Sequence, residues 1–106
     1  MSEQSEAKRD GARLQKNSGR GEYQKGDARL DIFTVDYKEF AKSFSLSRSV
    51  WAKVCSDALR NRLSEPALKV ILGTGAEKIR LWVVAEHIIE DYIRLRKLEE
   101  EWLAKN

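Results

Sequence analysis

The sequence predicts an α/β fold with a mixed sheet. This expectation rests on apolar residues that repeat at helical spacing in some segments and alternate at strand spacing in others. Strand-like segments lie at 12–16, 27–30, 32–40, 67–72 and 78–84. Helix-like segments lie at 2–10, 47–62 and 85–104. A length of 106 residues fits one domain, 1–106, with a core in 2–84 and a C-terminal helix in 85–106.

The first helix is expected to be short and weak. Ser2 is a suitable N-cap and Gly11 a suitable terminator. Ala7 is its main apolar residue, so disorder is an alternative for this segment. The glycine- and serine-rich stretch at 17–21 then predicts a loop.

Residues 25–40 predict a hairpin with its turn near Asp31. Because alternate residues of a strand share a face, the second strand has two different sides. One side is polar and carries Thr34, Asp36 and Lys38. The other is expected to pack in the core and carries Phe33, Val35 and Tyr37.

The middle helix is expected to begin after Ser47, a suitable N-cap. Its apolar stripe comprises Val50, Trp51, Val54, Cys55, Ala58 and Leu59. Residues 64–66 (Ser-Glu-Pro) predict a break before the next strand. The last helix is more apolar than a small sheet requires, so its far end is predicted to pack against a second copy of the chain.

The formal net charge is +3, with basic residues concentrated in 8–29 and three glutamates at 99–101. A basic front half favours a polyanionic partner about as strongly as it favours an ordinary solvated surface. Cys55 is the single cysteine, so no internal disulfide is possible. The start of the chain does not resemble a signal peptide, and no apolar run approaches the ~20 residues that span a bilayer. These points favour a cytoplasmic protein.

Two aspartates and a lysine are the candidate site. Asp27 lies in the turn before one strand, and Asp36 lies in the middle of its neighbour, so both are expected to converge on one magnesium ion. The carbonyl of Tyr37 is a further candidate ligand. Lys38, on the same face as Asp36, is placed to hold an attacking water or to stabilise transition-state charge. This chemistry suits cleavage of a phosphodiester.

The pattern Asp27…Asp36-Tyr37-Lys38 resembles the catalytic pattern of the PD-(D/E)XK nuclease superfamily. Residues 18–27 are similar to the Ser-Gly loop and Gly-Asp turn of archaeal and phage Holliday-junction resolvases in that superfamily. The resemblance covers residues 3 to about 72, or 84 if the last strand belongs. The sequence departs from the pattern at Gly26, where the superfamily name has proline, and at Asp36, where glutamate is commoner.

The resemblance implies a restriction-endonuclease-like core with the order α-β-β-β-α-β. It makes Asp27 and Asp36 ligands of Mg²⁺, for which Mn²⁺ can substitute, and Lys38 the catalytic lysine. It places Ser18 and Gly19 in a loop that contacts the DNA backbone or the metal. It also implies a glutamate on the first helix, for which Glu3 and Glu6 are both open.

Other basic residues are candidates for DNA contact. Lys16, Arg20 and Lys25 lie in or beside the glycine loop, where backbone N–H groups can face a phosphate. Lys42 and Arg48 lie near the start of the middle helix, and helix N-termini bind phosphate. Lys53 lies one turn further on, although Asp57 is an alternative surface partner for it.

The leading functional hypothesis is a magnesium-dependent endonuclease acting on branched or junction DNA. Symmetric cutting of two strands favours a homodimer. One alternative is a non-catalytic DNA-binding module on a nuclease-like fold. A further alternative is an interaction protein that uses the C-terminal helix.

Overall fold

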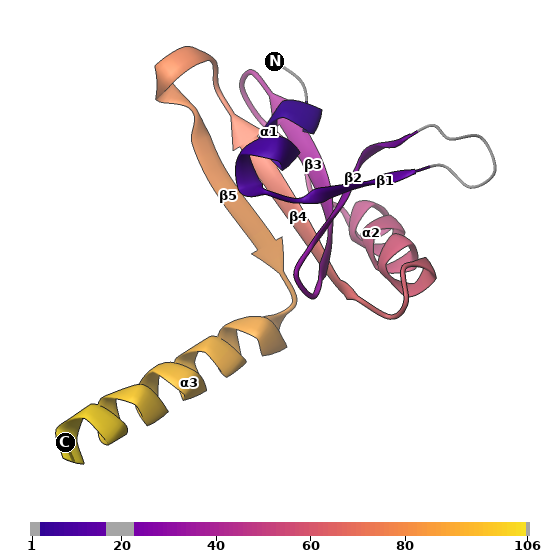
Figure 1. Ribbon diagram of the computed structural model, residues 1–106. Coiled ribbons are helices and arrows are strands. Elements are labelled where there is room, and N and C mark those ends of the chain that lie inside the picture. Colours follow the sequence, from indigo (N-terminus) through magenta and orange to yellow (C-terminus); the bar gives the residue numbers. More distant parts are fainter. Residues whose placement is uncertain (1–2, 17–22, 106) are drawn as a thin grey trace.

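The computed structural model describes residues 3–16 and 23–105, with side chains for 5–13 and 28–105. It is a mixed α/β structure (Figure 1). The helices are α1 (Glu3–Asp10), α2 (Arg48–Arg60) and α3 (Glu86–Lys105), with a short 3₁₀ turn, η1 (Gly75–Glu77). The strands are β1 (Arg13–Lys16), β2 (Tyr23–Leu30), β3 (Phe33–Phe40), β4 (Glu65–Leu72) and β5 (Ile79–Val84).

The five strands form one sheet in the order β1-β2-β3-β4-β5. β3 and β4 run parallel, and the other neighbours are antiparallel. α2 makes the crossover that a parallel pair requires. The expected mixed sheet and the expected order of helices and strands are therefore confirmed.

Two strand boundaries differ from the expectation. β2 begins at Tyr23 rather than near residue 27, because its first half pairs with β1 at Lys16↔Tyr23. β4 begins at Glu65 and includes Pro66, which was expected to lie in a break. Pro66 lies opposite Thr34 at the start of β4, where a sheet tolerates a proline. The predicted turn at Asp31 is present, with φ at 54°.

The sheet has two faces, each covered by one helix (Figure 1). The α1 face holds a cluster of Ala7, Ala28, Val35, Tyr37, Ala67 and Ile71. The α2 face holds a cluster of Val54, Leu68 and Val70. Along β3, Val35 and Tyr37 pack on the α1 face, whereas Thr34 hydrogen-bonds to Asn61 at the end of α2. The predicted alternation along this strand is confirmed.

α1 contacts the sheet through charged side chains as well as through Ala7. Glu6 is 1% exposed, and its Oε1 accepts a hydrogen bond of 2.5 Å from Nε of Arg80. Lys69, 3% exposed, donates from Nζ to both carboxylate oxygens of Asp10, at 2.7 and 2.8 Å. Its Nζ also lies 3.4 Å from Oε1 of Glu6. This buried ion network explains how a helix with almost no apolar face packs in an ordered position.

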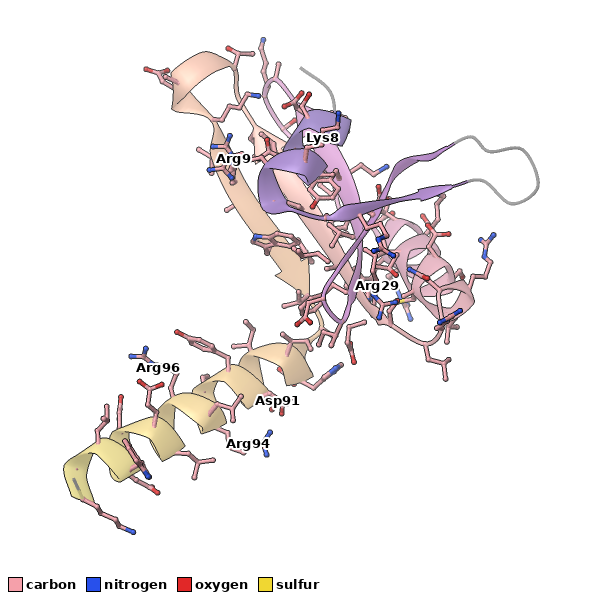
Figure 2. The ribbon with its side chains drawn as sticks, in the orientation of Figure 1. Lys8, Arg9, Arg29, Asp91, Arg94 and Arg96 are labelled. Carbon is pink, nitrogen blue, oxygen red and sulfur yellow. The ribbon has the colours of Figure 1, made fainter. Side chains whose placement is uncertain are left out.

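α3 extends away from the sheet (Figure 1), and none of its described residues is buried. Figure 2 shows its labelled side chains Asp91, Arg94 and Arg96 projecting into open space. Near its first turn, Nε2 of His87 lies 3.0 Å from Oε1 of Glu65 on β4. Within the described residues, no helix is long and apolar enough to cross a membrane.

Candidate metal site

The hairpin of β2 and β3 places residue 27 beside Asp36. Their register runs from Leu30↔Phe33 at the turn to Asp27↔Asp36. Residues directly opposite in an antiparallel pair lie on the same face, with Cα atoms ~4.5–5.5 Å apart. The two positions predicted to share a cation are therefore neighbours, although the side chain of Asp27 lies outside the described ones.

Asp36 is a buried carboxylate with an amine next to it. It is 4% exposed, and its Oδ2 lies 3.4 Å from Nζ of Lys38. The Lys38 side chain is 30% exposed, so part of it lies at the surface. Burying a charged group is costly unless it is paired, and Lys38 provides part of that pairing. The predicted placement of Asp36 and Lys38 on one face is confirmed.

Tyr37 has its side chain on the other side of the sheet. Its hydroxyl donates to Oδ2 of Asp10 at 3.0 Å beneath α1. Burial, together with the hydrogen bond to Asp10 and the Asp10 charge, raises the pKa of the Tyr37 hydroxyl far above its ordinary value of 10.0. The phenol therefore stays protonated and structural. The role of its main-chain carbonyl as a metal ligand stays a prediction.

Glu6 does not lie beside Asp36. It belongs to the ion network on the α1 face, whereas Asp36 is on the α2 face. Burial raises the pKa of the Glu6 carboxyl, but the Arg80 hydrogen bond and the Lys69 charge outweigh burial, so the net pKa is below its ordinary value. Glu6 is thus an ionised structural partner, and of the two glutamates left open for the metal site this one requires correction. The side chain of Glu3 lies outside the described ones.

The predicted DNA-contacting residues divide into two groups. Ser18, Gly19 and Arg20 lie outside the described residues, as do the side chains of Lys16 and Lys25. Lys42 and Arg48 are exposed and lie on either side of Ser47, the N-cap of α2. Lys53 is 68% exposed on α2. Three exposed basic side chains therefore lie along α2 and the segment that precedes it.

Asp57 has a different setting from the surface role that its spacing from Lys53 suggests. The expected pair is present, with Nζ of Lys53 3.8 Å from Oδ2 of Asp57. However, the Asp57 side chain is 9% exposed, and its Oδ2 is buried without a hydrogen-bond partner. The signal in the sequence was weak: Asp57 lies three residues after Val54, a position of the apolar stripe.

These acidic positions fit a hard divalent cation, which binds carboxylate and carbonyl oxygens. A buried carboxylate oxygen without a hydrogen-bond partner is also the kind of atom that a cation satisfies. Among the described side chains no group of three His, Cys, Asp or Glu residues forms a metal site.

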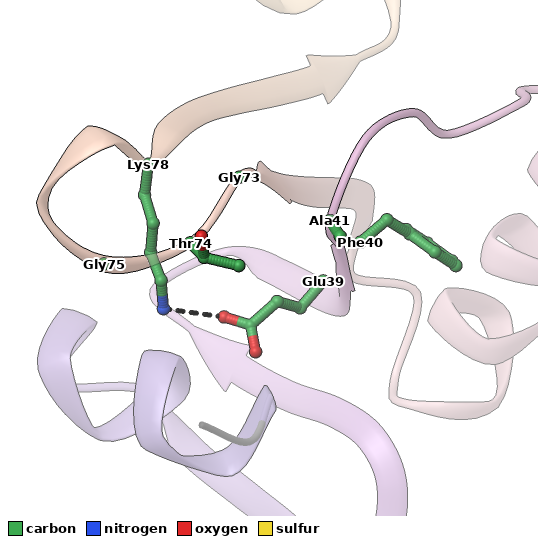
Figure 3. Close-up of a pocket in the computed structure, with 7 residues that line it drawn as sticks. All are labelled: Glu39, Phe40, Ala41, Gly73, Thr74, Gly75 and Lys78. Carbon is green, nitrogen blue, oxygen red and sulfur yellow. Dashed lines mark hydrogen bonds and ion pairs between the residues drawn. The ribbon is translucent and has the colours of Figure 1, made fainter.

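The hollow drawn in Figure 3 is a separate feature. It lies where β3 and β4 end and is lined by Glu39, Phe40, Ala41, Gly73, Thr74, Gly75 and Lys78. Lys78 donates from Nζ to Oε2 of Glu39 at 2.9 Å, so these two charged residues of the hollow pair with each other. Neither Asp36 nor Lys38 lines it.

Comparisons of the chain with models of protein families, with curated proteins and with solved structures found no match to any of them.

Proposed function

We propose that the protein is a magnesium-dependent endonuclease that cleaves phosphodiester bonds in DNA. One observation carries this proposal: the register places residue 27 directly opposite Asp36, with the Lys38 amine 3.4 Å from the Asp36 carboxylate. Two acidic positions and one amine on a single sheet face suit metal-assisted phosphoryl transfer.

Each residue has a distinct part in this reaction. A bound Mg²⁺ supplies charge neutralisation on the phosphoryl oxygens and a more acidic water. Asp27 and Asp36 hold that ion, and the Tyr37 carbonyl is a further oxygen donor. Lys38 orients the attacking water or donates to a phosphoryl oxygen, and its partial exposure supports contact with substrate. The element order α1-β1-β2-β3-α2-β4 supports a restriction-endonuclease-like core.

The DNA backbone is expected to cross the α2 face. Lys42, Arg48 and Lys53 supply exposed positive charge on that side, and Arg48 opens the first turn of α2. Residues 13–29 add further basic side chains, including Arg20 and Lys25. Phosphate contacts of this kind make binding strongly dependent on salt. The resemblance of the sequence at 18–27 to that of junction resolvases favours branched or junction DNA as the substrate.

A homodimer is part of the proposal. The exposed large apolar side chains of α3 are Ile89, Tyr92, Ile93, Leu95, Leu98, Trp102 and Leu103. A standard interface buries on the order of 800 Å² per partner, and half-exposed side chains of this number and size supply about that area. Two copies joined through α3 place two cutting sites in one particle.

The direct test is cleavage of a labelled four-way junction and of a matched duplex with Mg²⁺. Asp36→Asn is expected to reduce the rate at least ~100-fold, because a metal ligand is lost while the shape is kept. Asp31→Asn is the matched control, since Asp31 is an exposed turn residue whose positive φ asparagine tolerates. Equal cleavage by Asp36→Asn and the parent would refute the proposal.

The alternative is a non-catalytic DNA-binding module, for which the basic α2 face is the supporting observation. It predicts salt-sensitive binding of DNA without magnesium-dependent turnover. The same assay decides between the two, because the parent protein would then bind the junction and leave it intact.

A further inference from the structure

The position of α2 over the sheet determines which of its residues face the candidate metal site. At its C-terminal end, Nδ2 of Asn61 donates to Oγ1 of Thr34 at 2.9 Å. Before its N-terminal end, the ring of Phe44 contacts the ring of Phe40, with centroids 5.4 Å apart. α2 therefore runs antiparallel to β3, with its last turn over the start of the strand.

The hydrogen bond between Asn61 and Thr34 shows which residues of α2 lie above which residues of β3. Asp57 lies four residues before Asn61, a rise of ~6 Å along a helix. Asp36 lies two residues after Thr34, an advance of ~6.6 Å along a strand. Because residues four apart share a helix face, Asp57 extends from α2 at the level of Asp36.

α2 packs on β3 and β4, and the flank that carries Asp57 lies on the side away from β5. NH1 of Arg29, on β2, donates to the main-chain oxygen of Asn61 at 3.2 Å, so this strand reaches the end of the helix. Trp51, on the opposite flank, packs against the cluster of Val54, Leu68 and Val70. Asp57 thus lies on the β3 side of α2, at the level of Asp36.

The Asp57 carboxylate is only partly satisfied by its neighbours. Its Oδ1 pairs with Arg60 at 3.2 Å and its Oδ2 lies 3.8 Å from Lys53, but those side chains are 73% and 68% exposed. Such solvent-exposed partners contribute little energy. Among the described residues, Oδ2 of Asp57 is the buried side-chain oxygen without a hydrogen-bond partner. A buried unsatisfied charged atom requires an explanation, and a bound cation gives one.

We propose that Asp57 is a third acidic ligand of the divalent cation, contributed by α2 and acting directly or through one ordered water. The inference rests on the proposed function, because it uses the same cation position. It goes beyond the pair of aspartates on the hairpin by joining the crossover helix to the site. A hard cation with oxygen ligands is the chemistry that this position recognises.

The test is a Mn²⁺ titration by calorimetry, together with thermal unfolding of the 106-residue chain with and without Mn²⁺. Asp57→Asn is expected to bind Mn²⁺ at least ~10-fold more weakly and to lose most of the metal-induced rise in Tm. Its Tm without metal is expected to stay the same or to rise, since an unsatisfied buried charge is removed. Asp91→Asn is the matched control, because Asp91 also pairs with an arginine three residues on, at 3.0 Å, but is 54% exposed.

The outcomes separate this inference from the proposed function. If the parent binds Mn²⁺, Asp36→Asn does not, and Asp57→Asn binds like the parent, the inference alone is overturned. If the parent does not bind Mn²⁺, both are overturned. If Asp57→Asn lowers the Tm without metal or fails to fold, the carboxylate is structural, which also overturns the inference.

Discussion

At the scale of single residues, Lys69 is the centre of the ion network beneath α1. Its amine is buried between Asp10 and Glu6, and it lies 5.2 Å from the centroid of the Trp82 ring. Each of these groups is far from Lys69 in sequence. The network therefore follows from the tertiary structure, and no local pattern in 2–10 indicates it.

Lys69→Met is expected to destabilise the protein by about 3–5 kcal/mol, because Glu6 and Asp10 would keep buried charges without their common partner. Urea unfolding measures this change. Lys97→Met, at an exposed position of α3, is the control and is expected to stay within about 0.5 kcal/mol. Equal effects of the two variants would contradict the account of the network.

Tyr37 gives the molecule a predictable response to alkaline pH. Its pKa is raised in the folded state, so above the ordinary value of 10.0 the unfolded chain loses this proton while the folded protein keeps it. The free energy of unfolding is therefore expected to fall as pH rises above about 10, and to be unaffected by this group at lower pH.

Denaturant unfolding between pH 8 and pH 11 tests this response. In Tyr37→Phe the decline is expected to be smaller, although the variant starts from a lower stability because the hydrogen bond to Asp10 is lost. Tyr92→Phe, at a 59% exposed position, is expected to follow the parent. A steeper decline in Tyr37→Phe than in the parent would be inconsistent with a raised pKa.

At this scale, the sequence predicted part of the candidate site. Alternation along a strand is enough to place Asp36 and Lys38 on one face. It does not place Glu6 or Asp57, because their settings depend on partners brought together by the sheet order. Glu6, one of the two glutamates left open for the site, instead pairs with Arg80, which is 74 residues away in sequence and is not indicated by any local pattern.

At the scale of elements, α2 depends on its N-terminal cap. Oγ of Ser47 accepts a hydrogen bond from the Val50 N–H at 3.2 Å. Ser47→Ala is expected to cost about 0.5–2 kcal/mol, and Ser56→Ala, at an exposed position within the helix, is expected to cost less. Thermal unfolding of both variants measures this. No difference between them would show that the cap does not stabilise α2.

Elements whose sequence has a clear helical or alternating pattern were predicted within a few residues. A strand end that is set by pairing with a neighbouring strand was not. α2 and β3 have clear helical and alternating patterns, and both were expected within a few residues of their bounds. The start of β4 was missed, because Pro66 reads locally as a break. Pairing with β3 overrides that local signal, since Glu65 and Pro66 lie opposite Phe33 and Thr34.

At the scale of the whole molecule, the exposed apolar side chains of α3 lead us to expect that the protein forms a homodimer through this helix. The double variant Leu95→Glu with Trp102→Glu is expected to be monomeric by sedimentation at concentrations where the parent is dimeric. Its body should stay folded, because these side chains are 59% and 65% exposed and support no core. Glu90→Ala with Glu101→Ala is the control, since it changes charge without reducing apolar area. A dimer that persists in the double variant would contradict this role of α3.

The central claim is that one divalent cation sits between residue 27 and Asp36. Anomalous diffraction from a crystal soaked in Mn²⁺ tests it most directly. The account predicts a single peak within about 2.0–2.3 Å of carboxylate oxygens of both Asp27 and Asp36. A peak that contacts only one of them, or a soaked crystal with no peak at this pair, would contradict it.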